Sequence, residues 1–372
     1  MYLSNVQVYK FKSDVIYHFD DFEESLQQDK ARNCGAQELS TFGWTNALGD
    51  HGNTLAYFSQ GKILLCAKRF ERVIPASVLN DMVHEQVKKV ELEENRSVKK
   101  KEREQIKDDI LTTITPQAFE KAATHYVLID TISKLIFVES ANHTKAEETL
   151  ALLRKSLGTL PVAPAFADLF IDTALTEYVS EQVPPKNFDF GGLATLVDSA
   201  EKTSEITLKD RDLYGDEIPE LMTSMLVSKL EMKYKDRLTF TIHSDGSIKR
   251  IKYSDVIKET NNDIASEEIA HRLGADFILV VAELTELFNS IYQAIREKID
   301  QGYEDCTQKS DIATPNIDAA EKIIIETKNT SISNLQRSLR IGYSNASHLL
   351  TELEKKGVVS APGNNGLREL LA

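Results

Sequence analysis

The sequence predicts an α+β protein, with a mixed body followed by a smaller helical module. Short runs rich in β-branched and aromatic residues recur in the first part of the chain, and stretches with a helical apolar period lie between and after them. From residue 315 onward the pattern changes to three short helices and a glycine-rich turn. A chain of 372 residues is long enough for roughly two or three compact units with a substantial core.

The strands of the body are predicted from apolar runs bounded by turn residues. Two pairs of runs indicate hairpins, and the second pair is joined at Asp245-Gly246, a typical two-residue β-turn. Because helical patterns are interleaved with these runs, the mixed α+β class follows. The predicted strands are Val6–Phe11, Ile63–Ala67, the hairpin Tyr126–Asp130 with Leu135–Val138, and the hairpin Leu238–Ile242 with Ile248–Tyr253.

Two long helices are predicted within the body, which we assign to residues 1–300. One is strongly charged, runs from Ala76 to Leu111 and ends before Pro116, so residues 76–116 are expected to form a charged helical projection. The polar residues 301–314 are predicted to be a linker. The second long helix carries an apolar stripe through Leu284, Leu287, Phe288, Ile291, Ile295 and Ile299.

The last segment, residues 315–372, predicts a compact module of three helices. The first covers residues 317–328, the second ends at Gly342, and the third runs from Ser344 to Lys356. Ser331–Ser333 is predicted to be a short extended stretch whose serines can cap the second helix. Val358-Val359 forms a short strand before a turn rich in Pro, Gly and Asn, which suits a hairpin wing. The pattern is that of a winged helix-turn-helix, a class of DNA-binding module.

Composition restricts the partners and the compartment. The formal net charge of −14 argues against a generic nucleic-acid binder, although a basic lining on an acidic shell can still attract a polyanion. No apolar run approaches the length of a membrane span, and the N-terminal MYLSNVQVYKFK lacks the apolar core of a signal peptide. We therefore expect a cytoplasmic protein without a membrane partner. Cys34, Cys66 and Cys306 are isolated and odd in number, which favours reduced thiols.

The segment SISNLQRSLRIGYSNASHLLTELEKKGVVSAPGNNGLRELLA resembles the gamma domain of FtsK-type DNA translocases along almost the whole module. The resemblance implies a winged helix in which the helix after Gly342-Tyr343 enters the major groove and binds G-rich polar sequences. Where that family typically has Asn-Arg-Ala-Ala-Arg, this chain has Ser344-Asn345-Ala346-Ser347-His348, so both arginines are missing. Arginine forked onto guanine is the usual chemistry of such recognition, and we expect the module to show little preference for G-rich DNA.

The body resembles the RdgC family of recombination-associated proteins. The resemblance is carried, in order, by Phe42-Gly43-Trp44, Leu48-Gly49-Asp50-His51, GKILLCAKR, VKKKEREQIKDDIL, KAEETLALLRKSLGTLPV, DGSIKRIKY and GADFIL. It implies a ring-shaped homodimer whose positively charged hole encircles double-stranded DNA with little sequence preference and limits RecA access, in the cytoplasm and associated with the nucleoid. Phe119 lies at a position that helps to close the ring between subunits in that family, although an ordinary core phenylalanine explains it equally well.

Three groups of basic residues in the body are candidates for DNA contacts. The densest group lies on the predicted projection, where a solvated face with i,i+4 ion pairs is the alternative. On a regular strand Arg250 and Lys252 share one face and Lys249 points to the other. Arg154 and Lys155 end a helix that begins near Lys145, where they could simply neutralise the helix C-terminus. The candidates on the projection are Lys88, Lys89, Lys99, Lys100, Lys101, Arg103 and Lys107.

The C-terminal module adds further candidates. Its seven basic residues are almost balanced by six acidic ones, so it would bind DNA only through a local cluster. Solvated surface charge is the alternative for each basic residue. The candidates are Arg337, Arg340, Lys355, Lys356 and Arg368 for phosphates, and Ser344, Asn345 and His348 on the predicted recognition helix.

Motifs of enzymatic chemistry are absent from the sequence. There is no G-x-x-x-x-G-K-[ST] phosphate loop, no H-E-x-x-H and no Cys-x-x-Cys, so neither a cofactor nor a metal is expected. Adjacent acids such as Asp20-Asp21 and Asp108-Asp109 could hold a metal, but such pairs arise by chance in an acidic chain. The sequence therefore predicts a non-enzymatic protein that binds double-stranded DNA and modulates recombination. The alternatives are an interaction scaffold that binds a Xer-type recombinase through the winged helix, and a sequence-specific regulator.

Overall fold

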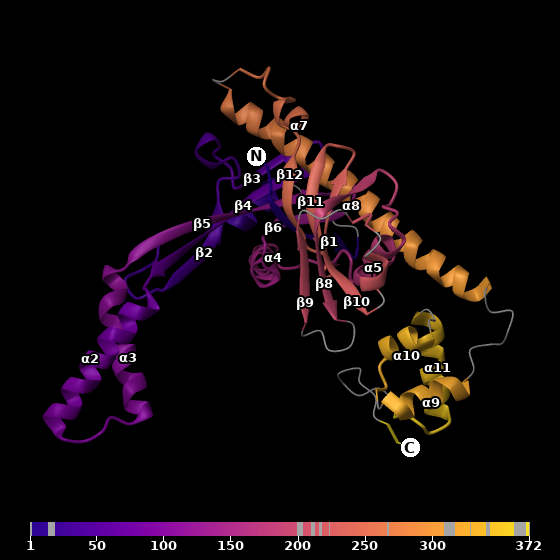
Figure 1. The fold of residues 1–372 in the computed structure, drawn as a ribbon. Helices are drawn as coiled ribbons and strands as arrows, with labels where there is room; N and C mark the ends of the chain where they lie inside the picture. Colours follow the sequence, from indigo (N-terminus) through magenta and orange to yellow (C-terminus); the bar gives the residue numbers. More distant parts are fainter. Residues whose placement is uncertain are drawn as a thin grey trace. The chain divides into compact units, whose positions relative to one another are not determined.

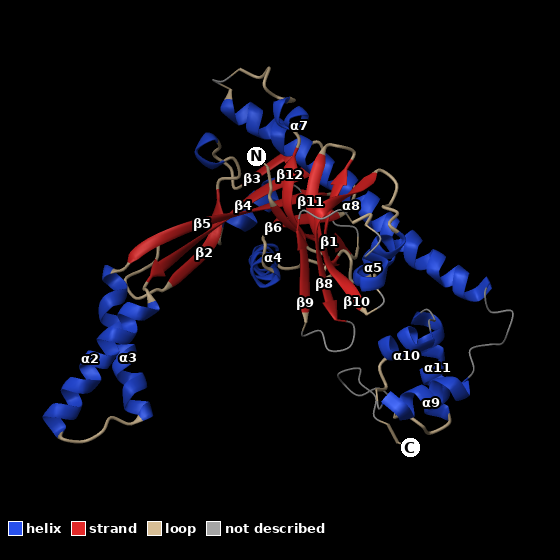
Figure 2. Ribbon diagram, viewed as in Figure 1, coloured by secondary structure: helices blue, strands red, loops and turns tan. Residues whose placement is uncertain are grey.

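The computed structural model divides the chain into two compact units, Met1–Tyr292 and Gln293–Ala372, and the division falls within one long helix. The residues that the structure describes are 2–13, 19–198, 204–209, 213–215, 218–222, 224–265, 268–308, 317–327, 329–339, 343–360 and 370–371. Figure 1 shows the course of the chain and Figure 2 its helices and strands.

The first unit is built around one antiparallel sheet, in which 12 strands are described. The strand order is β2-β4-β5-β6-β1-β12-β11-β10-β8-β9, with β3 paired to β4 and β7 to β1. The strands are β1 (Asn5–Phe11), β2 (Ser40–Thr45), β3 (Ala56–Ser59), β4 (Lys62–Val73), β5 (Phe119–Asp130), β6 (Leu135–Glu139), β7 (Val162–Pro164), β8 (Phe188–Asp198), β9 (Glu205–Lys209), β10 (Met225–Tyr234), β11 (Leu238–His243) and β12 (Ile248–Tyr253). Both predicted hairpins are confirmed, as β5–β6 and β11–β12, and Gly246 adopts a φ of +81° at the second turn.

One face of the sheet packs against helix α8 (Ile269–Gln308). The Tyr234 hydroxyl of β10 donates to Glu286 at 3.1 Å and contacts Ser290 at 2.8 Å, which fixes the helix over Phe240 and its neighbours. Along α8, residues from 269 to 301 are long and apolar enough to cross a membrane by length and composition alone. Because Phe277, Val281 and Leu284 are buried inside the protein, this hydropathy is also that of a core helix.

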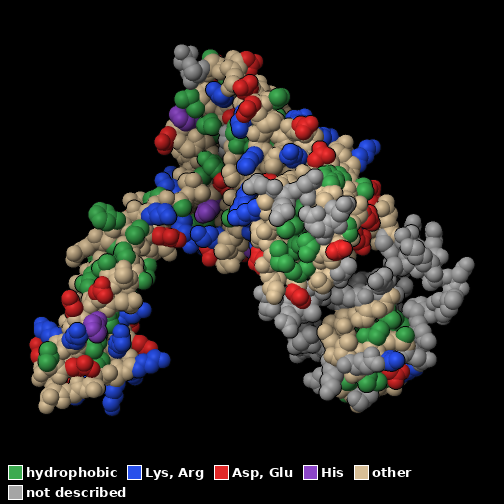
Figure 3. Space-filling view, in the orientation of Figure 1, with side chains coloured by type: hydrophobic (Ala, Val, Ile, Leu, Met, Phe, Trp, Pro, Cys, Tyr) green, Lys and Arg blue, Asp and Glu red, His purple; other side chains and the backbone are tan. Residues whose placement is uncertain are grey.

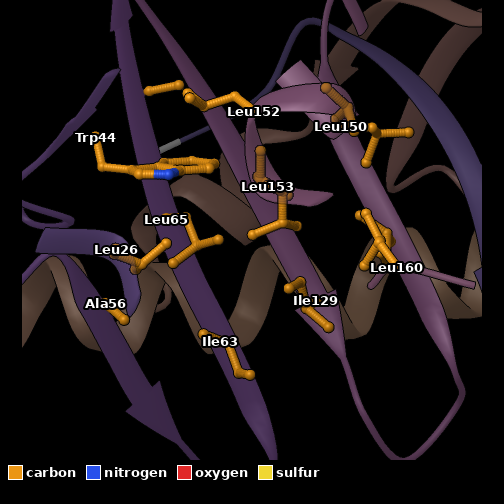
Figure 4. Close-up of a cluster of buried hydrophobic side chains, with 14 of the residues drawn as sticks. Leu26, Trp44, Ala56, Ile63, Leu65, Ile129, Leu150, Leu152, Leu153 and Leu160 are labelled. Carbon is orange, nitrogen blue, oxygen red and sulfur yellow. The ribbon is translucent and has the colours of Figure 1, made fainter. Parts of the chain in front are cut away.

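The opposite face, over β4, β5, β6 and β1, forms a second core with helices α1 (Phe19–Gln27) and α4 (His143–Leu157) (Figure 4). Trp44 is fully buried there, and its indole Nε1 donates to Ser156 Oγ at 2.9 Å. Leu150 and Leu153 of α4 meet Ile129 and other strand residues. Smaller helices complete the unit: α5 (Ile171–Glu181), α6 (Ile218–Leu221) and α7 (Asp255–Glu259).

Strands β4 and β5 extend from the body as an arm that carries a helical hairpin (Figure 1). The prediction of one helix from Ala76 to Leu111 is wrong, because two antiparallel helices occupy the segment: α2 (Ala76–Glu94) and α3 (Lys100–Ile114). The break comes at Asn95, which adopts a left-handed φ of 48°, a conformation that asparagine tolerates well. Arg96 binds both Glu94 and Glu102 across the turn, so the hairpin is fixed by ionic contacts as well as packing.

The second unit contains the end of α8 and three further helices, α9 (Ile317–Thr327), α10 (Ile332–Leu339) and α11 (Tyr343–Lys355). The three predicted helices of the module are thus confirmed, and α8 continues to Gln308 into the segment expected to be a linker. The Ser331 hydroxyl caps α10 by accepting from Asn334 N at 3.1 Å, but helix α10 already includes Ile332 and Ser333, which were expected to be extended. Val359 forms an antiparallel bridge with Leu370, while the turn over residues 362–366 lies outside the described residues.

Candidate nucleic-acid interface

A β-bulge in strand β12 decides which basic side chains share a face of the sheet. Lys252 pairs with Thr239 and Lys249 with Thr241, so one extra residue is accommodated between them and Arg250 adopts a φ of +54°. The prediction that Arg250 and Lys252 share a face opposite Lys249 is therefore wrong. Lys249 and Lys252 lie on the same face, because their partners Thr241 and Thr239 are two residues apart.

Strand pairing brings two more lysines to this face. Lys233 of β10 and Lys252 of β12 both pair with Thr239 and so lie in one row, while Lys229 pairs with His243. Glu231 lies between the two β10 lysines on the same face, opposite Thr241, which also pairs with Lys249. We call Lys229, Lys233, Lys249 and Lys252 the lysine face. Lys229 and Lys233 were not among the candidates from the sequence, because only the pairing of β10 with β11 and of β11 with β12 places them on the same face as Lys249. The signal was their spacing of four residues on one strand, which puts them on the same side.

The charges of the lysine face are only partly neutralised. Lys229 is paired with Glu205 at 2.9 Å, whereas Lys233 and Lys252 are exposed and Lys249 half-buried, all three without an ion pair in the described part of the chain. The side chain of Arg250 is exposed at the bulge, and its backbone N donates to Asn5 Oδ1 at 3.2 Å. Holding a non-glycine residue at positive φ costs about 1 kcal/mol, so this position carries a cation despite a backbone that favours glycine.

Histidine 243 lies within this cationic environment. Burial, together with the positive charges of Lys249, Lys229 and Arg250, lowers the pKa of His243 to about 4, although Asp245 opposes the shift. His243 is consequently neutral at pH 7. The Thr241 hydroxyl nearby is buried with no hydrogen-bond partner in the described residues. The face thus presents fixed positive charge of the kind that attracts an anionic ligand.

The helical hairpin provides the second cationic surface. All seven candidates on α2, on α3 and in the turn between them are exposed, and none forms an ion pair with the described residues. Within the described residues, the hairpin therefore shows no face held together by i,i+4 ion pairs. The ion pairs found there are those of Arg96 with Glu94 and with Glu102. Figure 3 shows Lys and Arg side chains around the hairpin and again over the body where the arm joins it.

Apolar side chains are exposed at the base of the hairpin. Phe119, at the first position of β5, is 87% exposed, which rules out the alternative of a core phenylalanine. It pairs with Val73, which is also exposed, and the backbone of Leu39 accepts from Arg72 beside it. Val78, at the start of α2, is half exposed as well. We call Val73, Val78 and Phe119 the apolar patch.

Arg154 and Lys155 differ in their contacts. Lys155 is paired with Asp29 at 2.5 Å, and Ser156 also donates to Asp29. Although burial raises the pKa of Asp29, these hydrogen bonds from Lys155 and Ser156 lower it overall. Lys155 therefore helps to tie α4 to the segment after α1, while Arg154 is exposed.

In the second unit, two of the candidate lysines are already ion-paired. Lys355 contacts Glu352 at 2.7 Å and Lys356 contacts Glu321 at 3.4 Å. The first pair lies within α11 and the second joins the end of α11 to α9, and both reduce the charge available for phosphate. The side chains of Arg337, Arg340, Ser344, Asn345, His348 and Arg368 lie outside the described residues.

Among the described residues no group of three or more His, Cys, Asp or Glu side chains could hold a metal ion. Cys34 and Cys66 carry free thiols, and burial, followed by the charge of Glu139, raises the pKa of Cys66 to about 12. The side chain of Cys306 lies outside the described residues.

These features define a two-unit α+β protein, in which an antiparallel sheet with a lysine face is extended by a helical arm and followed by a small helical domain. Residues 1–298 match the family model described as "Putative exonuclease, RdgC", and residues 313–372 match the model of the "Ftsk gamma domain". The chain belongs to the RdgC family and carries an FtsK gamma domain at its C-terminal side.

Curated relatives agree with the family over the whole first part of the chain. A recombination-associated protein RdgC of Pseudoalteromonas translucida (strain TAC 125) is 47% identical over 296 residues, which are 79% of this chain and 98% of the relative. Proteins of the same name from Yersinia enterocolitica and Yersinia pestis (strain Pestoides F) are 35% and 34% identical over the same share of each chain. Because the match takes in almost the whole of each relative, these relatives have no counterpart of most of the second unit.

Proposed function

We propose that this protein is a non-enzymatic, double-stranded DNA-binding protein that modulates homologous recombination by limiting the access of RecA to DNA. The lysine face is the observation that carries the proposal. It holds cations on β10 and β12, the two strands that flank β11, and three of the four make no ion pair in the described residues. Lysines of this kind contact phosphates, which are common to every DNA sequence, so binding is largely independent of sequence.

The acidic total charge is compatible with this function. A net charge of −14 repels DNA at a distance, but within a Debye length of about 8 Å the local cations dominate. The hairpin lysines extend the cationic surface along the arm. Lys155, Lys355 and Lys356 contribute less, because each already has a carboxylate partner.

A homodimer that closes into a ring is the second part of the proposal. The apolar patch supports it, because exposed apolar side chains gathered at one place are typical of an interaction site. Phe119 would meet the same patch of a second copy in an isologous contact. A ring of this kind would hold DNA topologically, in the cytoplasm and in association with the nucleoid.

The name of the family model includes exonuclease, whereas the curated relatives are named for recombination. Hydrolysis of a phosphodiester commonly uses two metal ions held by clustered carboxylates. The part of the chain that the structure describes brings no such cluster together, which favours the binding function.

For the FtsK gamma domain we propose a winged helix that makes an auxiliary DNA contact. Its linkage to the body raises the effective concentration of the second contact, so even weak binding by this domain would strengthen attachment. A scaffold that binds a Xer-type recombinase is the second candidate. The ion pairs of Lys355 and Lys356 favour it, since they leave fewer free cations for phosphates on α11.

The proposal is tested by measuring the DNA affinity of the full-length protein and of the Lys249→Ala/Lys252→Ala variant on several unrelated duplexes. The variant should bind every duplex more weakly by a similar factor. Lys258→Ala is the control, because Lys258 is an exposed lysine that is paired with Asp255 outside the lysine face. Loss of affinity for one sequence only would instead indicate a sequence-specific regulator.

A further inference from the structure

A cavity opens where strand β1 changes its partner. On one edge β1 pairs with β12 at Asn5 and Val6, and further along it pairs with β7 from Tyr9 to Phe11. The sheet is therefore split beside Gln7 and Val8, and a cavity of about 250 Å³ lies at the split. Its other walls are His143 at the start of α4, the segment from Pro164 to Ile171 and the turn from Ser244 to Gly246.

One polar group that lines this cavity has no hydrogen-bond partner in the described part of the chain. Gln7 is only 5% exposed, and its Nε2 has no hydrogen-bond partner in the described residues. An unpaired buried amide is costly, and a half-turn of the amide presents either a donor or an acceptor to an occupant. Asp245 accepts from the Ser247 backbone N at 2.9 Å and from its hydroxyl at 2.5 Å, both through Oδ1.

The remaining walls include aromatic and apolar side chains. Phe166 packs directly on Gly246, where an added Cβ would lie 3.0 Å from the phenyl ring. On the other side the rings of Tyr9 and His143 stack with an interplanar angle of 9°, and the Tyr9 hydroxyl contacts His143 Nδ1 at 3.3 Å. The cavity thus combines aromatic and apolar walls with an amide and a carboxylate.

We propose that this cavity receives one unpaired nucleobase of a bound DNA. A nucleobase has a flat face and an edge with adjacent donors and acceptors, which an amide and a carboxylate can match. The volume is below the roughly 300–1,000 Å³ of sites for drug-sized ligands and suits one or two rings. The inference rests on the proposed DNA binding, and the turn that forms one wall leads directly into β12, the strand that presents Lys249 and Lys252.

The test uses full-length protein and two duplexes that differ at one position, where an adenine faces either thymine or an abasic site. Fluorescence anisotropy should show about tenfold tighter binding to the duplex with the orphan adenine, because that base leaves the stack at little cost and gains aromatic contacts. Equal affinity of the wild-type protein for the two duplexes would overturn the inference. Failure to bind either duplex would reject the proposed function instead.

Two variants show whether the preference comes from the cavity. Ala167→Trp places a large side chain at an exposed lining position and should abolish the preference without changing binding to the paired duplex. Ala151→Trp is the matched control, since Ala151 is exposed on α4 and does not line the cavity. Gln7→Leu keeps the volume and removes the amide, and it should reduce the preference severalfold. A preference that survives both Ala167→Trp and Gln7→Leu would place the base elsewhere.

The source of the base is tested by competition. Free adenosine, added at the same concentration as the orphan-adenine duplex, should leave the preference unchanged, because phosphate contacts supply most of the affinity of the DNA. Displacement of that duplex by equimolar adenosine would contradict a base presented by DNA.

Discussion

Removal of the three unpaired lysines of the lysine face, Lys233, Lys249 and Lys252, should reduce the salt dependence of DNA binding by a calculable amount. Each phosphate neutralised by a lysine contributes about 0.9 to the slope of log K against log salt. With one protomer engaged, the triple alanine variant should lower the slope by about 2.7. Between 50 and 200 mM salt the affinities of wild type and variant should therefore converge by about 40-fold.

The assay is a titration of a fluorescent duplex with full-length protein at four or more salt concentrations. Lys229→Ala should change the slope by less than one phosphate contact, because Lys229 already has Glu205 as a partner. Lys258→Ala should leave the slope unchanged. The reasoning is refuted if the triple variant retains the wild-type slope, since the lysine face would then not touch phosphate.

Three further predictions follow from the same structure. Arg250→Gly should raise the free energy of unfolding by about 1 kcal/mol in denaturant titration, because glycine accepts the positive φ of this position. The same substitution should weaken DNA binding. A loss of stability would show that the arginine side chain holds the bulge. Phe119→Asp should halve the mass in light scattering, whereas Phe170→Asp, at another exposed phenylalanine, should not; a dimer that survives Phe119→Asp places the contact elsewhere. The third prediction concerns the protonation of His243. Because the folded protein lowers its pKa, the unfolded state binds more protons between pH about 4 and 6.5, and the free energy of unfolding should rise with pH through that window. His243→Gln should flatten this rise, and an unaltered profile would mean that another group is responsible.

Much of the fold could be predicted from local patterns. The hairpin at Gly246 was predicted because an Asp-Gly pair between two alternating runs specifies a two-residue turn, and the structure places Gly246 at positive φ there. The helices of the second unit were likewise predicted from their apolar periods and the glycine that ends α11. In these segments the local signal and the tertiary structure agree.

The wrong predictions concern segments whose local sequence pattern is compatible with two different structures. The charged segment after Ala76 keeps a helical composition across Asn95, but the left-handed Asn95 and the non-helical residues as far as the extended Lys99 convert one helix into a hairpin. The orientation of Lys249 failed for a similar reason, because a single inserted residue in β12 reverses the alternation of side chains. Neither change has a strong signature in one sequence.

The candidate interface was predicted in part. Lys249 and Lys252 were named from a basic run, but Lys229 and Lys233 join them only through the pairing of β10 with β11. Phe119 was identified through the family resemblance, and its exposure distinguishes it from a core residue. The cavity beside Gln7 could not be foreseen, because it is formed by segments from four parts of the chain.

The most direct test of the central claim is a salt challenge on circular and linear DNA. Full-length protein is bound to a covalently closed plasmid and to the same plasmid cut once, and the retained protein is measured after transfer to high salt. A closed ring around DNA predicts that protein stays on the circle and slides off the linear form, because salt weakens phosphate contacts but does not open a topological link. Equal loss from both forms would contradict encirclement and leave only surface binding.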